Sequence, residues 1–266
     1  MTTEQQLSPR VEALAQETRR QLEAAVHEHK NVVYANSLGA ESLVLTDIIW
    51  THVPGIEIFT LDTGRLHDET LALLDRLERR YQQRFHVYYP DATQIEEYVR
   101  RNGINGFYQG SEERLSCCNI RKVEPFKRAV AGRAAWVTGV RREQSAERAL
   151  GEPVAWDPRY SMWKISPMLD WTDAAVWEYI KAKNLPYNPL HDKGYPSIGC
   201  APCTRAIEPG ADPRSGRWWW ENPESRECGL QPRRGSTFNG ITRRRRLVTL
   251  WIISRSSCAW PVNRCW

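Results

Sequence analysis

The chain alternates stretches of helical periodicity with short apolar runs typical of strands. Val11, Leu14, Leu22 and Val26 recur at helical spacing in the first stretch, and runs such as VVYA and IEIF are too short and too apolar for surface helices. The pattern predicts helices at residues 8–29, 41–50, 67–81, 93–101 and 172–183, and strands at 31–36, 55–61, 85–89 and 134–140. This alternation predicts an α/β fold with a mainly parallel twisted sheet flanked by helices.

Ligands of such sheets bind beyond the carboxyl ends of the strands, so the loops after the strands are the first to inspect. The first loop carries Ser37, Gly39, Glu41 and Ser42. Gly39 permits a tight turn, and the helix that follows presents free N–H groups that suit a phosphate or a sulfate. The loop lacks the GK[ST] ending of a Walker loop. Taken alone, a plain strand–helix turn is the more common interpretation.

Two further loops at the same edge carry arginines. The loop at 61–65 contains Asp62, Thr63, Gly64 and Arg65, and the segment at 138–148 contains Gly139, Arg141 and Arg148. Single arginines are usually solvated surface. Several at one sheet edge indicate a small polyanionic ligand, because guanidinium groups bind its oxygens bidentately.

Four of the seven cysteines form two close pairs, the adjacent Cys117 and Cys118 and the CxxC of Cys200 and Cys203. Four thiolates suit tetrahedral zinc or an iron–sulfur cluster. Adjacent cysteines make a poor chelate for one ion, which favours a cluster, while buried free thiols or a redox pair remain the simpler alternatives. Lys122 lies close enough in sequence to offset thiolate charge. A lone Cys228 follows an unusual WWW run, and a cationic setting would make its thiol a nucleophile.

The charge balance divides the chain into two parts. The formal net charge is +5, yet residues 231–266 contain eight Arg and no Lys, Asp or Glu, which leaves residues 1–230 with 29 basic and 32 acidic residues. A body of net charge −3 argues against a general nucleic-acid-binding surface. The longest apolar run near the end is too short for a membrane span, and the first residues lack a signal-peptide core. We therefore expect a cytoplasmic protein with reduced cysteines and no membrane partner.

Seven motifs in one order resemble a known family: SLGAES (37–42), LDTGR (61–65), CCNIRKVEP (117–125), TGVRREQS (138–145), GCAPCTR (199–205), GRWWWE (216–221) and ECGL (227–230). They resemble assimilatory adenylyl-sulfate (APS) reductases of the 4Fe–4S type. These enzymes belong to the phosphoadenylyl-sulfate reductase family, with the PP-loop, adenine nucleotide alpha-hydrolase-like fold. The resemblance covers about residues 31–230.

The resemblance implies that APS and a dithiol are converted to sulfite and AMP in assimilatory sulfate reduction and cysteine biosynthesis. It implies that Cys228 attacks the sulfur of APS and carries a thiosulfonate, which thioredoxin or glutaredoxin then releases as sulfite. The cluster ligands would be Cys117, Cys118, Cys200 and Cys203. The substrate contacts would include Lys122, Arg148, Arg214 and Arg217.

The sequence also leaves alternatives. A phosphoadenylyl-sulfate (PAPS) reductase or dual-specificity enzyme is the nearest, although relatives of that kind usually lack the four cysteines. More remote are a PP-loop RNA-modifying enzyme, with nucleic acid bound by the Arg-rich tail, and a zinc-stabilised binding module. A homo-oligomer is compatible with the sequence.

The motif pattern ends just after Leu230. We expect a reductase domain over residues 1–230, with a nucleotide-binding core at about 30–200 and a cluster and catalytic segment at 200–230. Gln231 stands where the family generally has His, and residues 231–266 form an atypical Arg- and Trp-rich tail. A basic arm and an end translated from an altered reading frame are the two interpretations of this tail, and we favour the second.

Overall fold

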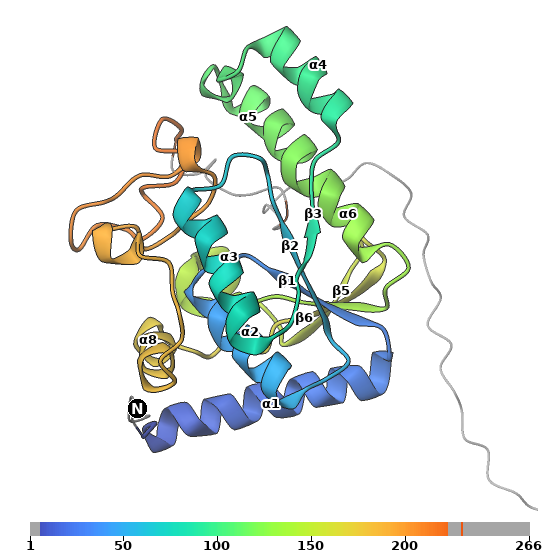
Figure 1. The fold of residues 1–266 in the computed structure, drawn as a ribbon, viewed down its shortest axis with the longest axis vertical. Coiled ribbons are helices and arrows are strands. Elements are labelled where there is room, and N and C mark those ends of the chain that lie inside the picture. The colour runs from blue at the N-terminus through green and yellow to red at the C-terminus, as the bar shows by residue number, and fades with distance from the viewer. Residues whose placement is uncertain (1–5, 223–229, 231–266) are drawn as a thin grey trace, which may run out of the picture. The chain divides into compact units, whose positions relative to one another are not determined.

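Six strands form one mixed sheet at the centre of the fold (Figure 1). The computed structural model describes residues 6–222 and Leu230. Their order in the sheet is β3-β2-β1-β4-β6-β5, and every neighbouring pair is parallel except β5 with β6. The strands are β1 (Val32–Asn36), β2 (Glu57–Leu61), β3 (His86–Tyr88), β4 (Ala135–Val137), β5 (Val154–Asp157) and β6 (Met162–Ile165). The predicted mainly parallel sheet is confirmed, together with its four predicted strands.

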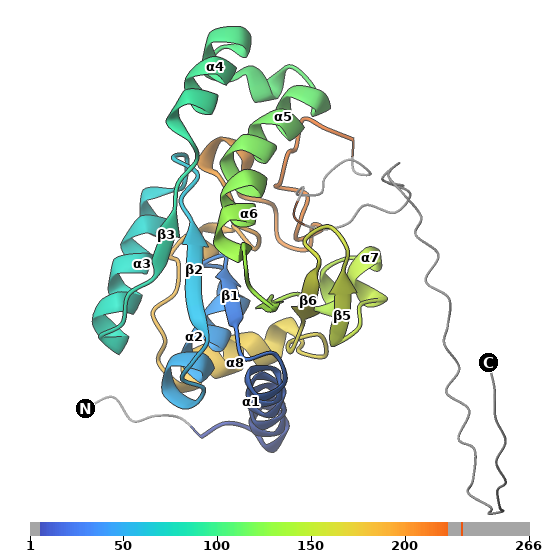
Figure 2. The same cartoon turned by 90° about the vertical axis from the view of Figure 1, so that its right-hand side faces the viewer.

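Helices cover both faces of the sheet (Figures 1 and 2). The larger core lies between one face and α1, α2, α3 and α8, and includes Tyr34, Ile58 and Trp171. The smaller core lies between the other face and α6, where Phe126 packs with Phe59 and Trp136. The helices are α1 (Pro9–His29), α2 (Ala40–His52), α3 (Asp68–Tyr81), α4 (Ala92–Asn102), α5 (Ser111–Cys118), α6 (Glu124–Val130), α7 (Ala146–Ala149) and α8 (Asp173–Ala182).

Local sequence explains where two of the helices begin. Ser8 caps α1, where its hydroxyl accepts a hydrogen bond from the Val11 N–H at 3.4 Å and Pro9 occupies the first turn. Thr172 caps α8 in the same way, accepting from the Ala175 N–H at 3.1 Å. Such caps satisfy N–H groups that the helix itself leaves unpaired.

The α-helices and strands that the periodicity did not predict lie between residues 103 and 165. Helices α5 and α6 are joined through a π-helical turn, Asn119–Val123, into one run that carries the Cys117-Cys118 pair at its middle. Strands β5 and β6 are four residues each and pair antiparallel at the end of the sheet. No helix in the described residues is both long and apolar enough to cross a membrane.

The strand order reverses between β1 and β4. From β1 the chain proceeds to β2 and β3 on one side, and later to β4 and β6 on the other. In doubly wound sheets the crevice at this reversal, beyond the carboxyl ends of the strands, is where ligands bind. The loops after β1, β2 and β4 are the three that the sequence singles out.

Candidate functional site

The loop after β1 is shaped by Asn36 and Leu38 as much as by its glycine. The Asn36 carboxamide accepts a hydrogen bond from the Leu38 N–H at 2.7 Å and donates to the Thr46 hydroxyl at 2.7 Å. Leu38 takes a left-handed conformation (φ 58°), whereas Gly39 has φ −81°. The tight turn is therefore made by Leu38, not by Gly39 as the sequence suggested. Asn36, the last residue of its strand, was the missed signal, because short amide side chains commonly hydrogen-bond two residues onward.

Hydroxyl groups close this loop into a compact cradle at the start of α2. The Ser37 and Ser42 Oγ atoms lie 2.8 Å apart, and the Ser37 N–H donates to Ser42 Oγ at 3.2 Å. Ser42 is buried and Ser37 is exposed. The cradle combines hydroxyl donors with the positive end of α2, an arrangement that can bind a phosphate or sulfate group.

The loop after β4 contacts this cradle through an ion pair between Arg141 and Glu41. The Arg141 Nε donates to Glu41 Oε1 at 2.9 Å, and its terminal nitrogens reach Glu143 and Asp173 at 3.0 Å each. The Arg141 side chain is only 6% exposed. A Cβ at Gly139 would lie 3.2 Å from Glu41 Cβ, so glycine allows the close approach of the two loops. Glu41, Gly139 and Arg141 are thus brought together, with Arg141 directed at carboxylates.

The loop after β2 connects the sheet edge to the cysteines. Gly64 has φ 66°, a conformation that favours glycine, and its N–H donates to Asp62 at 2.8 Å. Thr63 Oγ1 lies 3.3 Å from the Cys200 sulfur, and the Ala201 N–H donates to the Arg65 carbonyl at 2.8 Å. Figure 1 shows the orange C-terminal part of the described chain beside this loop. Thr63 and Cys200, which are 137 residues apart in the sequence, are therefore in contact.

Cys117, Cys118, Cys200 and Cys203 are buried, form no disulfide, and line one small cavity. Four cationic side chains also line the cavity. The complete lining is Arg65, Phe107, Arg114, Cys117, Cys118, Arg121, Lys122, Cys200, Pro202 and Cys203. No three His, Cys, Asp or Glu side chains within residues 6–222 are grouped in a way that could hold a single metal ion.

Burial and local charge shift the thiol pKa values in opposite directions. Burial raises the pKa of Cys117, and it raises the pKa of Cys203 to about 12, with the neighbouring Cys200 adding to the effect. Burial is the largest single influence on Cys200 and acts in the same direction, but Lys122, the Thr63 hydroxyl, Arg217 and Arg121 together outweigh it. The pKa of Cys200 therefore falls below its ordinary value. Cations near a buried thiol favour the thiolate, which is the form that binds metals.

Positive charge also lies near the adjacent pair. The charge of Arg121 opposes the rise in the pKa of Cys117, and Arg114 interacts electrostatically with Cys118. Arg121 in addition donates to the Thr63 carbonyl at 2.6 Å. These contacts stabilise thiolate charge inside the cavity.

Two of the remaining predicted cations, Arg214 and Arg217, lie on the segment that follows the CxxC. Arg217 is buried, lies over the Trp218 ring at 4.6 Å, and donates to Ser197 and the Ile198 carbonyl at 3.3 Å each. The Arg217 N–H donates to the Arg214 carbonyl at 2.9 Å, and Arg214 is half-buried. On the other loop, Arg148 donates to Gln144 at 2.5 Å. Cys228 lies outside the described residues, as does Gln231.

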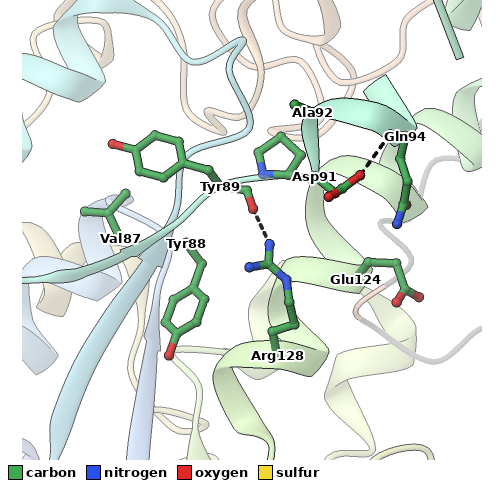
Figure 3. Close-up of a pocket in the computed structure, with 9 residues that line it drawn as sticks. Val87, Tyr88, Tyr89, Asp91, Ala92, Gln94, Glu124 and Arg128 are labelled. Atoms are coloured by element: carbon green, nitrogen blue, oxygen red, sulfur yellow. Dashed lines mark hydrogen bonds between the residues drawn. The ribbon is translucent and has the colours of Figure 1, made fainter. Parts of the chain in front are cut away.

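A separate pocket of about 530 Å³ opens at the carboxyl end of β3, against α6 (Figure 3). Arg128 donates to the Tyr89 carbonyl there, and Asp91 caps α4 by accepting from the Gln94 N–H at 3.0 Å. Its polar groups thus hold the β3–α4 turn in place. None of the side chains predicted for the site lines this pocket.

Comparison with solved structures defines the class of fold. The described part is similar to PAPS reductase from Candida auris in a phosphate complex, with a TM-score of 0.62 and 26% identity over 76% of this chain and 99% of the other. FMN adenylyltransferase from Candida glabrata shares the fold alone, with a TM-score of 0.52 and 15% identity over 82% of this chain and 75% of that chain. The protein has the adenine nucleotide alpha-hydrolase-like, PP-loop fold.

Sequence comparison narrows this class to one family. Residues 31–206 match the phosphoadenosine phosphosulfate reductase domain. The chain is 51% identical to adenosine 5'-phosphosulfate reductase of Allochromatium vinosum over 84% of its length and 90% of the relative's. It is 51% identical to the protein of the same name from Burkholderia cepacia, over 76% and 81%. This chain belongs to the phosphoadenosine phosphosulfate reductase family.

Proposed function

We propose that this protein reduces APS to sulfite and AMP in assimilatory sulfate reduction. The observation that carries the proposal is the cavity in which four buried free thiols meet four cationic side chains, next to the loop after β2. The relatives named adenosine 5'-phosphosulfate reductase, at 46–51% identity, support the same substrate. Free cysteines are typical of a reducing compartment, so we place the reaction in the cytoplasm.

We propose further that Cys117, Cys118, Cys200 and Cys203 hold a 4Fe–4S cluster. The donor set fits such a group, because four thiols share one cavity with Arg114 and Arg121, and Thr63 Oγ1 lies 3.3 Å from the Cys200 sulfur. The cations lining the cavity offset the charge of four thiolates. When bound, a cluster of this kind supplies an electrostatic influence beside the sulfate group of the substrate.

Binding of APS is assigned to the loops at the carboxyl edge of the sheet. The cradle formed by Ser37, Ser42 and the N-terminus of α2 suits the phosphate, as helix N-termini do for anions. Lys122, Arg148, Arg214 and Arg217 are proposed to contact the sulfate and phosphate oxygens. Their positive charge reduces the repulsion that a thiolate meets as it approaches a sulfur shielded by anionic oxygens.

Cys228 is the proposed nucleophile. Its thiolate forms a bond to the sulfur of APS, the bond between that sulfur and the bridging oxygen breaks, and AMP leaves with the electron pair. A thiol of thioredoxin or glutaredoxin then attacks the Cys228 sulfur, sulfite departs with the bonding electrons, and the second thiol of the partner resolves the mixed disulfide. The partner ends as a disulfide.

The discriminating experiment is sulfite release from APS and from PAPS under identical conditions with thioredoxin. We expect APS to be used with the higher kcat/KM. Equal or greater efficiency with PAPS would contradict the proposed substrate and favour a PAPS-reducing or dual-specificity enzyme. Salt-dependent RNA binding without sulfite release would instead point to an RNA-modifying enzyme.

A further inference from the structure

Residues 103–110, between α4 and α5, separate the four-cysteine cavity from solvent. Phe107 lines the cavity, is 1% exposed and packs in a buried cluster with three of the four cysteines. Ile104 and Tyr108, in the same segment, are 65% and 41% exposed. One side of the segment therefore faces the cysteines and the other faces water, as expected of a cover.

Arg65 holds the first half of this segment. Its guanidinium donates to the Ile104 carbonyl at 2.5 Å and to the Asn105 carboxamide oxygen at 3.1 Å. The guanidinium also lies 5.3 Å from the centre of the Phe107 ring, an arrangement in which a cation and an aromatic face attract each other. Because Arg65 belongs to the loop after β2, these contacts tie the segment to the edge of the sheet.

Tyr108 holds the second half of the segment. Its hydroxyl donates to the Pro202 carbonyl at 2.6 Å. Pro202 stands between Cys200 and Cys203 in the sequence and itself lines the cavity. The Tyr108 ring also contacts Trp220, with the ring centres 4.5 Å apart. The segment is therefore bound to the CxxC turn as well as to the loop after β2.

We propose that residues 103–110 are a cover that opens and closes over the four-cysteine cavity, and that Arg65 and Tyr108 set how often it opens. The three hydrogen bonds that hold it are exposed, and exposed contacts of a surface loop open at a lower free energy than the core of a sheet. While the cover is closed, dissolved molecules reach the thiols slowly. The cover does not depend on what the cysteines hold, and only the iron measurement that tests it rests on the proposed cluster.

The test measures how fast anaerobically purified protein loses its iron to excess EDTA, followed by the visible absorption. Tyr108→Phe removes the hydroxyl that reaches Pro202, and Asn105→Ala removes one partner of Arg65 without changing any charge. We expect each variant to lose iron faster, on the order of fivefold, the effect of one lost hydrogen bond on the opening equilibrium. Tyr89→Phe, at a position that is 57% exposed, is the matched control and should behave like the parent. Unchanged rates in Tyr108→Phe and Asn105→Ala overturn the inference.

Urea below the unfolding transition separates opening of the cover from unfolding of the protein. Local opening exposes little surface, so the rate of iron loss should depend only weakly on urea. A rate that rises in step with the unfolded fraction overturns the inference, even if the variants lose iron quickly. A parent protein purified without iron contradicts the proposed cluster but not the cover. In that case the rates at which iodoacetamide alkylates Cys117 and Cys200 in the same variants, measured by peptide mass, decide between the same two outcomes.

Discussion

Arg114 and Glu221 form a bidentate ion pair whose side chains are 0% and 2% exposed. Nε and Nη2 of the arginine reach the two carboxylate oxygens at 2.8 and 2.7 Å, and the guanidinium lies 4.9 Å from the centre of the Trp218 ring. The pair joins α5, which carries Cys117 and Cys118, to the segment that leads toward Cys228. It therefore links the two halves of the proposed site.

Replacing Arg114 with Met should lower the free energy of unfolding by about 3 kcal/mol, because it leaves the Glu221 carboxylate buried without its cation. Urea denaturation of the purified variant measures the loss. Glu97→Ala, which removes the exposed pair with Arg101, is the control and should change stability by about 1 kcal/mol or less. The double variant Arg114→Met with Glu221→Leu should be more stable than Arg114→Met. If it is not, the buried charge is not the cause of the loss.

Cys203→Ser should remove the iron–sulfur cluster together with sulfite formation, because it deletes one of four ligands. Iron content and visible absorption of anaerobically purified protein report the cluster separately from activity. Cys258→Ser, outside the four-cysteine set, should keep both. A colourless parent protein with stoichiometric zinc would show that the four cysteines serve a structural zinc site instead.

The sequence was sufficient to predict the central part of the fold. Each predicted helix and strand is present, because long amphipathic stretches and short apolar runs report burial directly. Strands β5 and β6 were not predicted, since Trp156 and Trp163 are exposed on four-residue strands and give no clear alternation. The run from α5 to α6 was also missed, since its pattern is interrupted by the π-helical turn at residues 119–123.

The candidate site could be predicted only in part. The sequence singled out the three loops and the four cysteines, and in the structure Thr63 Oγ1 lies 3.3 Å from the Cys200 sulfur. The sequence could not show that Arg141 pairs with carboxylates, because its partner Asp173 lies 32 residues away and the pair depends on how α8 packs. The substrate contacts of these residues stay predictions.

Cys228→Ser should abolish the release of both sulfite and AMP while APS still binds, because a serine hydroxyl is a far weaker nucleophile than a thiolate. The parent protein, mixed with APS and no thiol, should gain the mass of one SO₃ group on the peptide that contains Cys228. Cys265→Ser should gain the same mass and retain turnover. Sustained turnover by Cys228→Ser, or modification of a different cysteine, would remove Cys228 from the mechanism.

Lys164 provides a prediction about pH. Burial, together with the charge of nearby Arg159, lowers its pKa to about 8, and its ammonium group lies 5.6 Å from the centre of the Trp136 ring. Below pH 8 the lysine is charged in both states, so the folded protein bears the cost of a partly buried charge. The pKa of a lysine in an unfolded chain is about 10.4. Between pH 8 and this value the unfolded state binds more protons than the folded state, so the contribution of Lys164 to the free energy of unfolding rises with pH.

Lys164→Met should therefore raise the free energy of unfolding at pH 7 by about 1 kcal/mol, after allowance for the lost contact with Trp136. The advantage should shrink steadily as the pH rises from 7 to 9.5, because the wild-type lysine becomes neutral in the folded state. Urea denaturation at several pH values measures the difference. Lys181→Met, at an exposed position on α8, is the control and should show no such trend. A gain that grows with pH would mean that Lys164 is stabilised in its charged form.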